Sequence, residues 1–235
     1  RIMLRKLILF AAAVMFIQPV LAETFFEGEA AAENSIQSRI DNVGTTLLNY
    51  NKIPHRIIFV YDKKEKKNLI SLDKDLTSRQ VVVYDGLYKS VQTDDELAAM
   101  LAREISAAVK SYSGIWGGTL DSVQVALGSK KFETVADKRA VDYMVNAGYN
   151  PLALIVFINK TCPQKRFDRF SRHNLTSKRL ARIYEYITYK YPQYLENNDY
   201  VNNKYYQNFL LTSLSNRRKL EEKIKNHSTE ELDYD

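Results

Sequence analysis

Residues 93–112 read TDDELAAMLAREISAAVKSY, and this segment carries the clearest structural pattern in the chain. Thr93 and Glu96 have the spacing of a capping box, in which a hydroxyl and a carboxylate satisfy opposing backbone amides at the start of a helix. Apolar residues then recur at helical spacing: Leu97, Leu101, Ile105 and Ala108. The segment therefore predicts a helix with one apolar face.

Helices and short strands are expected on both sides of this segment. Upstream, the apolar spacing predicts a helix over residues 30–50, and strand-like runs follow at residues 56–61, 68–72 and 80–84. Downstream, helices are expected at residues 131–147, after Asn150-Pro151, and at residues 176–191 and 205–225. Gly148 suits the position just beyond a helix end. This order predicts an α+β fold, mainly helical with a small mixed β-sheet.

The composition is that of an ordinary globular protein. The chain has 235 residues, with 34 lysines and arginines against 28 aspartates and glutamates, and 45% of its residues are hydrophobic. These values exclude collagen, low-complexity disorder and a polytopic membrane protein. The single cysteine, Cys162, excludes an intramolecular disulfide and a zinc site built on several cysteines. Three histidines leave little scope for histidine-based metal chemistry.

Residues 1–22 have the features of a secretory signal peptide. Basic residues precede an unbroken apolar run from Leu7 to Ile17, and small residues end at Ala22. This run is short for crossing a bilayer, so an uncleaved anchor is the weaker interpretation. We expect export to the periplasm or the extracellular space, no stable membrane span, and no nucleic-acid partner. The expected division is a signal peptide at 1–22, a main domain at 23–195 and a helical extension at 196–235.

Three carboxylates fall on the apolar faces of two expected helices. Glu104 lies within the apolar face of the helix at 93–112, and Glu133 and Asp137 lie one turn apart within that of the helix at 131–147. An unpaired buried carboxylate is costly or takes up a proton. A metal ion, a basic side chain or a polar network should therefore face these groups. The alternative is that both helices are rotated and leave the carboxylates at a solvated edge.

Several ordered motifs resemble those of the HtpX-like zinc endopeptidases. Residues 94–105 resemble the acidic, Leu/Ala-rich active-site helix of that family, and residues 133–137 resemble its E-x-x-A-D element. Further similarity lies at Asn68, at residues 81–87 and 143–151, and at residues 172–174 followed by Arg179. The family includes the CAAX prenyl proteases, the mitochondrial OMA-type protease and the bacterial envelope proteases of the BepA and LoiP type. The resemblance implies a metallopeptidase-like (minigluzincin) fold for residues 34–195.

The chain departs from this family at the zinc site. Where the family has H-E-x-x-H, this sequence has Arg103 and Ala107 at the two histidine positions. By resemblance, Glu104 holds the general-base position and Glu133 the third-ligand position, while Asp137 holds a supporting position behind the ligand.

Loss of both imidazoles removes most of the expected metal ligands. Catalytic zinc usually has three protein ligands, and two histidines four residues apart on a helix supply two of them. Glu133 is retained, and His173 adds at most one further ligand. We therefore expect no zinc cofactor and no peptidase activity, with Glu104 and His173 as the remaining catalytic positions.

Arg103 suggests how buried carboxylates persist without zinc. Its guanidinium is expected to point toward the former zinc position and to pair with Glu133, and with Asp137 as well, so that it takes over the charge of the metal. The alternative is that Arg103 extends into solvent.

Three functions follow from this reading of the sequence. The first is an exported pseudopeptidase that binds extended or unfolded envelope polypeptides along the strand at 68–72, in envelope protein quality control. The second is an active metalloendopeptidase with an irregular zinc site, in which Glu133 and His173 are ligands and Glu104 is the base. The third is a structural partner of an active peptidase paralogue.

Overall fold

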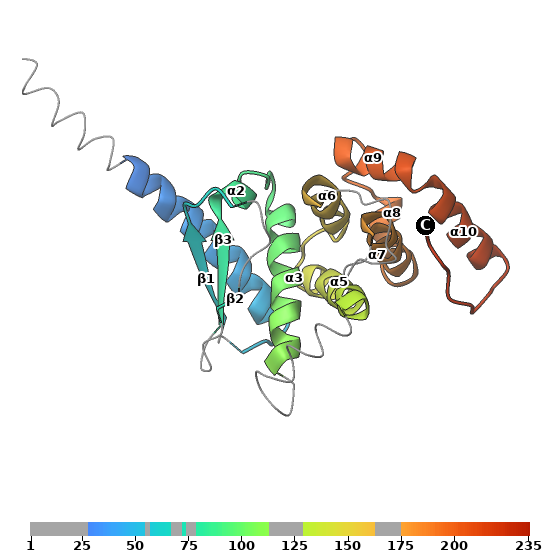
Figure 1. Cartoon of the computed structure of the whole chain (residues 1–235), viewed down its shortest axis with the longest axis horizontal. Helices are drawn as coiled ribbons and strands as arrows, with labels where there is room; N and C mark the ends of the chain where they lie inside the picture. Colours follow the sequence, from blue (N-terminus) through green and yellow to red (C-terminus); the bar gives the residue numbers. More distant parts are fainter. Residues whose placement is uncertain (1–27, 55–56, 67–71, 74–78, 113–128, 163–174) are drawn as a thin grey trace, which may run out of the picture.

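A computed structural model of the chain describes residues 28–54, 57–66, 72–73, 79–112, 129–162 and 175–235 (Figure 1). The predicted signal peptide at 1–22, the strand residues 68–71 and His173 lie outside these ranges. Among the helices described, none is both long enough and apolar enough to cross a membrane.

The first half of the structure is a helix followed by a small mixed sheet. The helix covers residues 28–50, and the strands are β1 (Ile57–Asp62), β2 (Leu72–Asp73) and β3 (Arg79–Tyr84). The strand order is β1-β3-β2, with β1 parallel and β2 antiparallel to β3. The prediction of a mixed sheet is confirmed, and β1 and β2 form its two edges.

The second half is helical. Its helices are α2 (Asp85–Tyr88), α3 (Asp94–Tyr112), α5 (Ser129–Asn146), α6 (Leu152–Thr161), α7 (Thr176–Lys190), α8 (Gln193–Glu196), α9 (Lys204–Thr212) and α10 (Leu214–Lys225). The mainly helical α+β fold is thus confirmed. The single helix predicted at 205–225 is wrong, because α9 ends at Thr212 and α10 begins at Leu214, with Ser213 between them. The Arg217 side chain contributes to this break by donating a hydrogen bond to the Leu210 carbonyl.

Short-range chemistry sets the ends of α5 and α6. Gly148 follows α5 with φ +82°, a left-handed conformation that favours glycine beyond a helix end. The Asn150 side chain accepts a hydrogen bond from the backbone N–H of Leu152 at 3.0 Å and so fixes the start of α6. Both features were predicted from the sequence.

The capping box at the start of α3 is present with one change. Thr93 Oγ1 accepts from the Glu96 amide, but the Glu96 carboxylate accepts from the amide of Gln92. Lys160, near the end of α6, donates to the same carboxylate at 2.9 Å. The cap therefore also joins α3 to α6.

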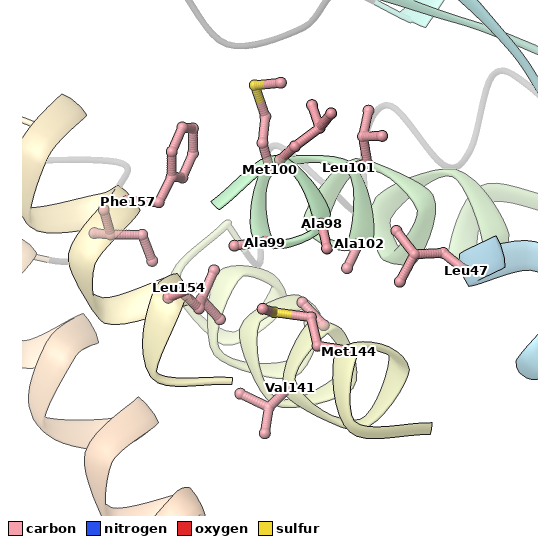
Figure 2. Packing of buried hydrophobic residues seen from close by; sticks show 14 of the residues in the cluster. Leu47, Ala98, Ala99, Met100, Leu101, Ala102, Val141, Met144, Leu154 and Phe157 are labelled. Carbon is pink, nitrogen blue, oxygen red and sulfur yellow. The ribbon is translucent and has the colours of Figure 1, made fainter. Parts of the chain in front are cut away.

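The helix α3 lies at the centre of the molecule, between the sheet and the later helices (Figure 1). In Figure 2, the small residues Ala98, Ala99 and Ala102 face α5 and α6, while Met100 and Leu101 point to the opposite side. Small side chains let two helices approach closely, so α3 is held with little freedom to rotate.

Residues beyond 195 pack against the main domain. Tyr206 and Phe209 of α9 belong to the hydrophobic core. The Asn159 side chain on α6 donates to the Tyr205 carbonyl at 2.8 Å. The helical extension is thus joined to the rest by core packing as well as by polar contacts.

Gly44 provides a test of how the first helix packs on the sheet. A Cβ atom at this position would lie 2.7 Å from Cζ of the buried Phe59 ring, closer than carbon atoms can approach. We expect Gly44→Ala to lower the free energy of unfolding by about 1–3 kcal/mol, as overpacked cores do. Urea unfolding measures the change.

Gly28→Ala is the matched control, because nothing lies within 4 Å of a Cβ atom at that position. It should leave the stability almost unchanged. Equal stability of the Gly44→Ala protein and the unmodified protein would contradict the packing described.

Candidate functional site

The predicted site residues meet in one charged group between α3, α5 and α7. We call this group the charge cluster; it consists of Arg103 and Glu104 of α3, Glu133 and Asp137 of α5, and Arg179 of α7. The three carboxylate residues are buried, with exposed fractions of 7% for Glu104, 7% for Glu133 and 2% for Asp137. The rotated arrangement with solvated carboxylates is therefore excluded.

Asp137 is the centre of the charge cluster. Arg179 donates to both of its oxygens, from Nε to Oδ2 at 3.0 Å and from Nη2 to Oδ1 at 2.9 Å. Burial opposes the charge of Arg179, but the adjacent Asp137 outweighs this effect and raises the pKa of the guanidinium. This two-bond geometry is the strongest form of an arginine–carboxylate pair.

Arg103 contacts all three carboxylates. Its Nε donates to Asp137 Oδ1 at 3.2 Å and its Nη1 donates to Glu104 Oε1 at 3.4 Å. Its Nη2 lies 3.8 Å from Glu133 Oε1, a distance that makes an ion pair but no direct hydrogen bond. The Arg103 side chain is 13% exposed, so it does not extend into solvent.

Glu104 is buried in surroundings that oppose its negative charge. Burial raises its pKa above the ordinary value of 4.5, although the charges of Arg103 and Arg179 act in the opposite direction. The charge cluster contains three carboxylates and two guanidiniums. A proton on Glu104 would therefore balance the charges of these five groups.

The local sequence explains why these side chains converge. Glu133 and Asp137 are one turn apart on α5, so they project from the same face. Ala107, one turn after Arg103 on α3, is half-buried and has no donor atom. The packing of α3 against α5 then brings Arg103 to the two α5 carboxylates.

These residues do not fit the zinc ion that the sequence motifs imply. Zinc takes imidazole, thiolate or carboxylate ligands, and neither Arg103 nor Ala107 supplies one. Glu133 and Asp137 both face the guanidinium of Arg103, whose positive charge would repel an ion placed beside them. Within the described residues, no group of three or more His, Cys, Asp or Glu side chains is arranged to hold a metal.

One feature of the site is not predicted from the sequence. Arg179 is expected only as part of a motif, yet it makes the closest contacts to Asp137. The sequence feature that could have indicated this contact is an arginine at a buried position in the first turn of the helix predicted at 176–191. The contact of Arg103 with Asp137 is expected from the sequence, whereas the second guanidinium on Asp137 is not.

A second unpredicted feature concerns the sheet. The Gln37 side chain, from the first helix, donates to the Phe59 carbonyl at 2.9 Å and accepts from the Tyr61 amide at 2.7 Å. These groups are two residues apart on β1, at the edge away from β3. A side-chain amide thus occupies the positions that a neighbouring strand would use.

No family model and no curated protein matches this chain. The resemblance carried by the sequence motifs therefore stays a prediction.

Glu104→Gln tests the proton on Glu104. The pKa of Glu104 is raised in the folded protein. The stabilisation that comes from its bound proton is therefore complete below about pH 4.5 and is lost as the pH rises through the raised pKa. The free energy of unfolding of the unmodified protein should fall relative to that of Glu104→Gln over this range. Urea unfolding across a pH series measures both, and parallel curves would contradict the raised pKa.

Arg179→Ala tests the importance of the Asp137 pair. It leaves a buried carboxylate without its main partner, so we expect a loss of about 3–5 kcal/mol in the free energy of unfolding. Arg182→Ala, on the same helix, is the control, because Arg182 pairs with an exposed Glu231 and its loss should cost less than about 1 kcal/mol. Equal losses in the two variants would refute the assignment.

Proposed function

We propose that this protein is an exported pseudopeptidase of the HtpX-like type, which binds extended envelope polypeptides without cutting them. The observation that carries the proposal is the position of Arg103. Its guanidinium contacts three carboxylates at the place where, by resemblance, the family holds a catalytic zinc ion.

The missing metal ligands are decisive for the chemistry. Zinc lowers the pKa of bound water from 15.7 to about 7. Without that help, forming hydroxide at neutral pH costs about 12 kcal/mol more, since each pKa unit corresponds to about 1.36 kcal/mol. Glu104 cannot make up this difference, because a carboxylate can accept the proton of a water molecule but supplies no positive charge to stabilise the hydroxide that forms.

The sheet supports the binding part of the proposal. Extended peptides bind to sheets by adding a strand at an edge, where the backbone N–H and C=O groups pair. At β1 these groups are occupied by Gln37. The second edge is β2, which includes Leu72 from the strand predicted at 68–72. We therefore assign peptide addition to the β2 side.

The expected location agrees with this role. Residues 1–22 predict export, and unfolded or assembling envelope proteins supply extended segments in that compartment. The partners we propose are such polypeptides, or an active peptidase paralogue that shares them.

The experiment combines cleavage with binding. Purified protein is incubated with casein in the presence and absence of a chelator and of added zinc, and its metal content is measured. Binding to reduced, unfolded α-lactalbumin is measured by fluorescence anisotropy, with the native, folded form of the same protein as control. We expect no cleavage, and binding to the unfolded form alone.

Two results would overturn the proposal. Chelator-sensitive cleavage of casein with one zinc ion per chain would establish the alternative, an active metalloendopeptidase with an irregular zinc site. Equal or absent binding of the two forms of α-lactalbumin would remove the polypeptide-binding role.

A further inference from the structure

The two guanidiniums of the charge cluster differ in how they are held. Arg179 makes two short hydrogen bonds to a single carboxylate and is 5% exposed as a residue. Arg103 spreads three longer contacts over three carboxylates, at 3.2, 3.4 and 3.8 Å. Arg179 therefore pairs with Asp137, whereas Arg103 is shared among three carboxylates.

The carboxylates around Arg103 depend on that cation. Glu104 and Glu133 are both buried, and Arg103 makes an ion pair with each of them. Arg179 hydrogen-bonds Asp137, and its charge also acts on Glu104 and Glu133. Removal of the Arg103 charge would leave the carboxylates of Glu133 and Asp137, one turn apart on α5, with less positive charge beside them in surroundings where desolvation strengthens their repulsion.

We propose that Arg103 is a tethered cation that fills a cation pocket formed by Glu104, Glu133 and Asp137, and that the pocket is therefore closed to divalent metal ions in this protein. The fold needs a positive charge between these carboxylates, and the chain supplies this charge itself through Arg103.

The positions of the three carboxylates around Arg103 favour a guanidinium over other cations. The three contacts leave Arg103 from Nε, Nη1 and Nη2, so every nitrogen of the planar group faces a different carboxylate. An ammonium is a point charge and cannot reach three separated partners in this way. An emptied pocket should therefore accept free guanidinium in preference to other small cations.

Chemical rescue of Arg103→Ala tests the proposal. The substitution should lower the melting temperature by about 6–20 °C, the shift that corresponds to breaking a buried ion pair in a chain of this size. Guanidinium chloride at millimolar concentration should then restore part of the loss. Sodium chloride controls for ionic strength, and urea, a neutral molecule of the same shape, controls for cavity filling.

Matched proteins complete the experiment. Arg182→Ala and the unmodified protein should show no rise in melting temperature with guanidinium, because their charge clusters are intact. Arg103→Lys should melt between the unmodified protein and Arg103→Ala, since it keeps the charge but not the fork of donors. If Arg103→Ala does not fold alone, refolding in the presence of guanidinium, with urea as control, gives the same comparison.

The unmodified protein is also tested for metal dependence. We expect its melting temperature to be the same after dialysis against a chelator and after addition of zinc. A fall on chelation would overturn the inference, as would a loss in Arg103→Ala no larger than that in Arg182→Ala, or rescue by urea equal to rescue by guanidinium. These outcomes are read from stability, so they are independent of casein cleavage and α-lactalbumin binding.

Discussion

Asp137 is bound by two guanidiniums that come from different helices, and this shared carboxylate is the constraint on which the site depends. Arg103 reaches it from α3 and Arg179 from α7, while Asp137 itself belongs to α5. Three helices are thus fixed at one buried point. Because buried charges are tolerated only when they are paired, the helices cannot slide without separating charges in a poorly solvated interior.

This constraint links the fold to the proposed activity. An enzyme that cuts peptides with a metal needs an open coordination position and a water molecule to activate. In the charge cluster the positive charge is covalently part of α3 and makes its contacts with protein groups. The same arrangement that stabilises the junction of the helices therefore supports the proposal that the protein binds peptides without cutting them.

Much of this was predictable from the sequence, for identifiable reasons. Helical spacing located α3 and α5, and it placed Glu104 and Asp137 among apolar neighbours, which turned out to be buried. Contacts between distant segments were harder to foresee. The pairing of Arg179 with Asp137 joins residues 42 positions apart, and no local pattern encodes which of many arginines makes it. The break at Ser213 was missed because apolar spacing continues across it.

The amide of Gln37 has a consequence for assembly. A chain of molecules linked strand to strand requires every copy to offer two vacant sheet margins, one for each neighbour. At Phe59 and Tyr61 the margin formed by β1 is sealed from within the same polypeptide. Because Gln37 occupies this margin, growth by this route would end after a single partner has joined.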